Sequence, residues 1–284
     1  ISNGGATYVT MSKSGVGTWI LSCTDVFSNA QTYQSALAVN AGTLDVQGYL
    51  TLNKGSASIA SGATLQISGA NGSVGGTSAI TVASGGTLVV DDRGAGAART
   101  SRVTNTITLS NGGLLSYLGS DQAATDTADN VGAITLGSGI SLITVDFTGT
   151  NTAQLTAASF SRSAGTGGLV LINGTNLGAN TSGSGEFLLG SIPTVVGTTT
   201  ASSGINTGAQ DTRIALFAVG ESGTATGQNG TATGTANTFL TYNGLTGYRP
   251  LNPTDEFTND AISAGNNTYL TTGTTPASAT AAIN

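Results

Sequence analysis

The sequence contains no histidine, and this limits the chemistry that its side chains can perform. Without imidazole there can be no Ser-His-Asp or Cys-His nucleophile, no histidine metal ligand and no histidine acid–base catalyst. A serine–lysine mechanism would need Lys13 or Lys54, the only lysines, and both lie in polar segments rich in glycine and serine. We therefore expect no catalytic, cofactor-binding or metal-binding residue, and predict that the chain is not an enzyme.

Paired carboxylates are the strongest remaining catalytic candidate, since many enzymes that cleave polysaccharides work with such pairs and some are built on β-helices. Asp91-Asp92-Arg93 directly follows an apolar stretch and could line a cleft with acidic and basic groups. The alternative, which we favour, is a strand that ends in a charged turn facing water.

A second acidic group consists of Asp121, Asp126 and Asp129, which fall within nine residues. Their carboxylate oxygens are ligands of the kind that Ca²⁺ prefers. The Asp-x-Asp-x-Asp-Gly loop is absent, however, as is the Gly-Gly-x-Gly-x-Asp calcium repeat. We expect a solvated loop here, with a calcium site as the alternative.

Three further side chains invite a chemical interpretation. Cys23 is the only cysteine and has no neighbouring lysine to lower its pKa, so we predict a small buried side chain rather than a reactive thiol. Trp19 and Tyr33 could stack on a sugar. Because these two residues and Leu21 occupy repeat positions, we expect them to pack in the core instead.

Composition excludes several classes of protein. Only 8% of residues are charged and the net charge is −6, so the chain lacks the cations that would neutralise a nucleic acid. No run of 18 or more apolar residues predicts a membrane span. The hydrophobic residues, 38% of the chain, form short runs that could bury a core. The sequence starts at Ile1 and lacks the charged segment followed by an apolar stretch that marks a signal peptide. We therefore expect any export signal to lie upstream or to have been removed.

A repeat is the main organising feature of the sequence. Five aliphatic residues, Val39, Ile59, Val82, Leu109 and Leu136, each lead a similar motif with a polar residue and a glycine behind it. They step by 20, 23, 27 and 27 positions, which suits one coil of a β-solenoid rather than a propeller blade or helical repeat.

Short alternating segments flank each motif, with aliphatic side chains at every second position and Thr, Asp or Gln between them. Period two sends the aliphatic side chains to one face of a strand, and Ser-Gly or Asn-Gly supplies the tight corner between strands. We predict an all-β parallel solenoid with in-register aliphatic ladders, its strands including residues 44–46, 65–67, 80–82, 88–90, 107–109 and 134–136.

The second half of the chain is less regular. We expect regular coils over residues 1–150 and less regular coils with long inserted loops over 151–284, with a separate subdomain over about 186–262 as an alternative. Strands are predicted at 140–147, 169–172, 213–219 and 238–242, with polar inserts at 196–210 and 221–237 and a turn-rich excursion at 248–253.

Segments 17–22 (GTWILS), 31–36 (QTYQSA) and 39–44 (VNAGTL) resemble the autotransporter-associated, or passenger-associated, β-strand repeat. Cys23, Gln31 and Ser35 depart from the residues usual in that repeat. The resemblance implies a β-helical passenger of a large exported protein, located outside the cell on a bacterial surface, of the kind often described as an adhesin.

A solenoid leaves open sheet edges at its two ends, and natural solenoids usually cover these ends with polar or helical caps. We recognise no such cap in the sequence. We therefore expect a structural subunit or segment of a surface fibre, assembled end to end with copies of itself or with further repeats of one long chain. The alternatives are an adhesin segment that binds surface glycans or proteins and, less favoured, a polysaccharide-cleaving enzyme. No nucleic-acid partner and no membrane insertion are expected.

Overall fold

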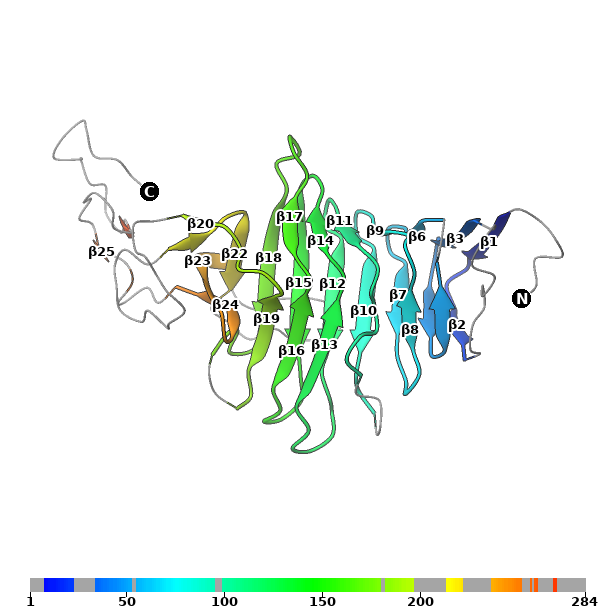
Figure 1. The fold of residues 1–284 in the computed structure, drawn as a ribbon, viewed down its shortest axis with the longest axis horizontal. Coiled ribbons are helices and arrows are strands. Elements are labelled where there is room, and N and C mark those ends of the chain that lie inside the picture. Colours follow the sequence, from blue (N-terminus) through cyan, green and yellow to red (C-terminus); the bar gives the residue numbers. More distant parts are fainter. Residues whose placement is uncertain are drawn as a thin grey trace.

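Short alternating segments form the coils of an all-β parallel β-solenoid of about 6 turns that spans residues 10–174, with a mixed sheet beyond. This computed structural model describes residues 8–22, 34–52, 55–94, 99–179, 182–196, 213–221, 236–251 and 256, and the short paired strands β25 (Thr258–Asn259) and β26 (Thr268–Tyr269). The regular elements of these residues are all strands, and no helix among them is long and apolar enough to cross a membrane. The predicted fold class is confirmed (Figure 1).

Most coils contribute a strand to each of three faces, which we call sheets A, B and C (Figure 1). Sheet A consists of β1 (Tyr8–Lys13), β3 (Gln34–Val39), β6 (Ala57–Ile59), β9 (Ile80–Val82), β11 (Ile107–Leu109), β14 (Ile134–Leu136) and β17 (Phe160–Arg162). Sheet B consists of β2 (Thr18–Leu21), β4 (Thr43–Val46), β7 (Thr64–Ile67), β10 (Thr87–Asp91), β12 (Leu114–Leu118), β15 (Ile140–Asp146), β18 (Leu169–Gly174) and β22 (Ala218–Glu221).

Sheet C begins with the pair β5 (Tyr49–Thr51) and β8 (Ser73–Gly75). Single bridges through Val103 connect β8 to the next member of this face, β13 (Thr127–Val131). The face continues through β16 (Ala153–Ala157), β19 (Gly185–Leu189) and β24 (Gly247–Pro250). Sheet C is therefore interrupted at the coil that carries Val103.

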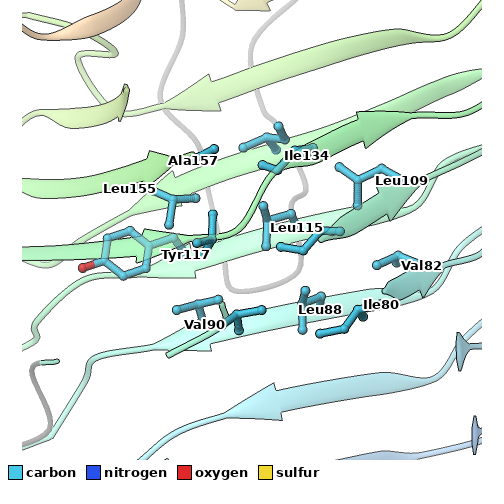
Figure 2. Packing of buried hydrophobic residues seen from close by; sticks show 14 of the residues in the cluster. Ile80, Val82, Leu88, Val90, Leu109, Leu115, Tyr117, Ile134, Leu155 and Ala157 are labelled. Atoms are coloured by element: carbon cyan, nitrogen blue, oxygen red, sulfur yellow. The ribbon is translucent and has the colours of Figure 1, made fainter. Parts of the chain in front are cut away.

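The register places like residues on top of one another, as the repeat predicted. Ile80, Ile107 and Ile134 are successive partners in sheet A, and Leu88 lies between Leu65 and Leu115 in sheet B. Figure 2 shows such side chains meeting in the interior of the coils. Leu88 and Leu115 are fully buried, and burial of a side chain of this size stabilises a fold by about 1.5–3 kcal/mol.

Glycines make the corners between sheets A and B. Gly62 and Gly85 occupy equivalent corners of adjacent coils with φ of 72° and 69°, values that side chains with a Cβ rarely adopt. The following coil has Asn111 at φ 49° and Gly112 at φ 90°. The Ser-Gly and Asn-Gly corners predicted from the repeat are thus confirmed.

The C-terminal end of the solenoid is capped. β22 continues sheet B in parallel with β18, and β24 continues sheet C in parallel with β19. The strand between them, β23 (Ala236–Asn243), is antiparallel to both and joins the two sheets into one. The expectation that no cap exists was wrong, because the cap is built from antiparallel strands rather than from a helix or a polar coil.

Aromatic rings fill the space beneath this cap. The Phe187 and Tyr248 rings stack with centroids 5.6 Å apart, and Tyr242 meets Tyr248 edge to face at 5.1 Å. Phe160 lies 6.2 Å from Phe187 and 6.4 Å from Phe217. These rings pack the interior where sheets B and C are joined through β23.

Regular coils continue past residue 150, to about residue 174. Within the segment 186–262, β19, β22 and β24 pair with strands of the solenoid sheets. A further antiparallel pair, β20 (Val195–Val196) with β21 (Ile214–Ala215), lies beside them. The predicted inserts 196–210 and 221–237 fall almost wholly outside the described residues.

Candidate functional site

Charged side chains gather where sheet B ends and the chain turns toward sheet C. Asp91, Leu118 and Asp146 are successive register partners at the ends of β10, β12 and β15. Since adjacent strands lie about 4.8 Å apart, the two aspartates are separated by roughly 10 Å along the sheet. The next residue, Asp92, has the opposite orientation, because side chains alternate between the two faces of a strand. The Asp91-Asp92 pair is therefore split between the outside and the inside of the solenoid.

Asp91 is held by a bidentate ion pair on the outer side. Arg93 donates from Nε to Oδ1 at 2.9 Å and from Nη2 to Oδ2 at 2.7 Å, and its backbone N–H also reaches Oδ1. Gln66 Nε2 donates to Oδ2 at 3.2 Å. The hydrogen bond to Asp91 raises the pKa of Arg93. Asp91 is only 4% exposed, so the prediction that this turn faces water was wrong for Asp91.

A small open pocket lies beside this ion pair and is lined by Arg93, Leu118, Gly119, Asp146, Phe147 and Thr148. Burial raises the pKa of Asp146, an effect opposed by a hydrogen bond from the Phe147 N–H and by the charge of Arg93. A carbohydrate-cleaving pair needs a second carboxyl group that is free to act. Arg93 and Gln66 already occupy Asp91, so the pocket offers a ligand one carboxyl group, that of Asp146.

Asp92 belongs to a buried ionic cluster inside the coils, which we call the Asp92–Arg102–Asp129 cluster. Arg102 Nε donates to Asp92 Oδ1 at 2.6 Å, and both side chains are fully buried. The Tyr117 hydroxyl donates to Asp92 Oδ2 at 2.9 Å. Arg102 also donates from Nη1 to the Gly72 carbonyl at 2.9 Å. The prediction of a solvated charged turn was therefore wrong for Asp92 as well, since its carboxylate forms a bond between coils.

Asp129 completes the cluster from β13. Its Oδ1 accepts the Arg102 backbone N–H at 3.1 Å, and its Oδ2 lies 3.9 Å from Arg102 Nε. Burial raises the pKa of Asp129 to about 7, and the neighbouring charge of Asp92 adds to the effect. Burial likewise raises the pKa of Asp92, although its bonds to Arg102 and Tyr117 oppose the shift. The Tyr117 hydroxyl pKa is also raised, first by burial and then by the charge of Asp92.

The three aspartates of the calcium alternative have separate partners. Asp121 accepts hydrogen bonds from the Gly94 N–H at 2.8 Å and from Gln122, while Asp126 accepts one from the Thr152 N–H. Both are exposed, as predicted for a solvated loop, but Asp129 points into the core. Among the residues that the structure describes, no group of three or more His, Cys, Asp or Glu side chains could hold a metal ion.

The residues singled out near the N-terminus occupy an edge of the solenoid. Trp19 is 48% exposed, so its predicted core packing was wrong, whereas Leu21 packs against the core as expected. β2 is the outermost described strand of sheet B and has no coil packed over it there. Cys23, Tyr33 and Lys54 lie outside the described residues.

Lys13 is fully buried and has a structural role in the described fold. Its Nζ donates to the carbonyls of Gly15 at 2.6 Å and Ala41 at 2.9 Å, and lies 5.5 Å from the centre of the Trp19 ring. These bonds join the first corner of the solenoid to the corner of the next coil.

The fold places the chain in the class of all-β parallel β-solenoids. Comparison with protein-family models found no match, and comparisons with curated proteins and with solved structures found none either. The class therefore rests on the coil geometry, and the buried Arg102 is the functional residue that sequence reasoning missed. Its partners lie 10 and 27 positions away, so only the exact coil lengths bring them together.

Proposed function

We propose that this chain is a structural segment of an extracellular fibre on a bacterial surface, and that it is extended at its N-terminal end by further β-coils. The support is an unpaired edge. Among the described residues β1 pairs only with β3, and β2 only with β4. A sheet edge of this kind carries backbone donors and acceptors that another strand can use.

The hydrogen bonds of β2 indicate which residues face the open side. The Gly17 and Leu21 carbonyls accept from Thr43 and Gln47 on the β4 side. In a parallel pair, alternate residues bond to opposite sides. Because Leu21 bonds toward β4, the residue directly before it, Ile20, directs its N–H and carbonyl to the open side. Its side chain is 58% exposed.

The C-terminal ends of sheets B and C contrast with this edge, because β23 joins the two sheets there, although β17 of sheet A pairs only with β14 among the described strands. Extension by edge pairing is therefore favoured at the N-terminal end. An isolated copy with one open end would pair edge to edge with a second copy and form a dimer, whereas longer rods would need coils supplied in sequence. The resemblance to passenger-associated repeats, which arrange many coils in one exported chain, is consistent with this arrangement.

Sedimentation of the wild-type chain and two variants at rising concentration tests the proposal. Ile20→Pro removes the outward N–H without removing a bond to β4, and Ile20→Ala trims the exposed side chain but keeps the donor. We expect wild type and Ile20→Ala to dimerise and Ile20→Pro to remain monomeric with an unchanged circular dichroism spectrum. Wild-type monomers at every concentration would refute extension at this edge and favour the adhesin alternative, in which the inserted loops make the contacts.

A further inference from the structure

The Asp92–Arg102–Asp129 cluster has more acidic groups than it can neutralise. Two carboxylates face one guanidinium, so the cluster has a net charge of −1 when both are ionised. Asp92 takes the closer contact with the cation, 2.6 Å against 3.9 Å for Asp129, and also accepts the Tyr117 hydroxyl. Asp129 is the surplus acid, and it is 1% exposed.

One oxygen of Asp129 has no hydrogen-bond donor. Its Oδ2 is buried and makes no hydrogen bond among the described residues, whereas both oxygens of Asp92 are satisfied. A buried ionised carboxylate without full pairing is costly, and such a group reduces the cost by binding a proton. The neutral acid leaves an Asp92–Arg102 pair with no net charge.

The surroundings offer Asp129 no second cation. The charged and titratable groups that act on it are Arg102 and Asp92, with Tyr117 on β12 beside them. From β16, the strand paired with β13, its register partner is Leu155, which is apolar and fully buried. The backbone N–H of Arg102 and its distant guanidinium favour the charged form of Asp129, but burial and the charge of Asp92 outweigh them.

We propose that Asp129 is the proton-binding group of a pH-responsive lock in the solenoid: the protonated acid holds β13 and the Arg102 segment closed, and its ionisation loosens them. The bonds at stake join three coils, since Arg102 contacts the Gly72 corner, Asp92 at the end of β10 and Asp129 on β13. The Val103–Val131 bridge lies directly beside them. The lock is independent of the proposed role in a fibre.

The direction of the response follows from the raised pKa. A carboxyl group whose pKa is about 7 in the closed state and ordinary in the open state destabilises the closed state as pH rises from about 4 to about 7, after which the effect is constant. From pH 5.5 to pH 8.5, the equilibrium for local opening should increase about 30-fold by the same linkage.

Hydrogen exchange measured by mass spectrometry, corrected for the intrinsic pH dependence of exchange, tests the lock. In the wild type, protection of residues 99–103 and 127–131 should fall about 30-fold between pH 5.5 and pH 8.5. Asp129→Asn, which mimics the neutral acid in shape, should lose this dependence. Asp146→Asn, a control at a partly buried carboxyl group outside the cluster, should retain it.

Equal pH dependence in the wild type and Asp129→Asn would overturn the proposal. If Asp129→Asn does not fold, carbon-13 NMR of the wild-type aspartate carboxyl groups decides the matter independently. A cluster carboxyl that titrates near neutral pH supports the lock, and titration of every aspartate in the ordinary range for carboxylic acids refutes it.

Discussion

Replacing Arg102 with methionine should be among the most destabilising single changes in this chain. Methionine fills much of the same volume but removes the charge and the side-chain donors to Asp92 and Gly72. It keeps the backbone N–H that donates to Asp129. Removing one partner of a fully buried ion pair leaves an uncompensated charge and costs about 3–5 kcal/mol. For a chain of this size, that loss corresponds to a fall in Tm of roughly 6–20 °C.

Arg93→Met is the matched control, because Arg93 also pairs with an aspartate at 2.7 Å but its side chain is 27% exposed. Partly exposed pairs contribute about 0–1 kcal/mol. Urea denaturation at pH 7.5 would measure both variants against the wild type. Equal losses in the two variants would refute the reasoning, because they would mean that burial of the Arg102 pair has no energetic consequence.

The charge argument also predicts recovery. Adding Asp92→Asn and Asp129→Asn to Arg102→Met removes the unpaired charges, so the triple variant should regain most of the lost free energy of unfolding. A triple variant no more stable than Arg102→Met would indicate that lost packing and hydrogen bonds, rather than charge, dominate the cost.

Three further predictions concern the core, the corners and the cap. Leu115→Ala should lower the free energy of unfolding by about 2–5 kcal/mol through the cavity it leaves. Leu245→Ala, at a 71% exposed position, should change it by less than about 0.5 kcal/mol. Similar losses for the two variants in urea denaturation would contradict the assigned core. A Cβ at Gly62 would meet open space, so Gly62→Ala should cost only about 1 kcal/mol for the positive φ of this residue. A Cβ at Gly86 would lie 2.7 Å from a carbonyl oxygen of the preceding coil, so Gly86→Ala should lower Tm further. A larger fall in Tm for Gly62→Ala than for Gly86→Ala would contradict the coil spacing. Phe187→Ala should lower the free energy of unfolding by about 3–5 kcal/mol, and hydrogen exchange should increase in β22–β24 more than in the coils. An equal increase of hydrogen exchange in the cap and in the coils would mean that the cap is not a separate unit.

Local pattern was sufficient to predict many strands of sheets A and B, whereas the sheet C strands β5, β8, β13, β16 and β19 were not predicted. Alternation at 80–82, 107–109 and 134–136 marked the strands of sheet A, and the glycine corners followed from residue type. The same alternation rule, applied to Thr127, Asp129 and Val131, would have turned Asp129 inward with its two neighbours, as the burial pattern of β13 has it. The prediction instead placed Asp129 in a solvated loop, because acidic residues are usually solvated, and so the alternation of residues 127–131 was not used.

Other features depend on distances that no local pattern contains. Arg102 meets Asp92 only because the chain between them returns to the same coil, and it reaches Gly72 only because the preceding coil ends at that height. The cap is similar in kind. The prediction of a strand at 238–242 is confirmed by β23, but the single strand predicted at 213–219 is divided between β21 and β22, and the turn-rich excursion predicted at 248–253 was wrong for β24. The antiparallel pairing of these strands is a tertiary choice.

The position of the aromatic rings suggests why this solenoid ends where it does. The ladders of the coils consist mainly of Leu, Ile and Val, with Tyr117 among them, and such aliphatic residues continue through Ile172. In the described residues, the ring contacts all lie among Phe160, Phe187, Phe217, Tyr242 and Tyr248. Rings of this size bury more apolar surface than Leu, Ile or Val, and they fill the interior beneath the cap. Phe160 follows Ile134 and Phe187 follows Leu155 in register, so the rings that end these two aliphatic ladders also close the interior beneath the cap.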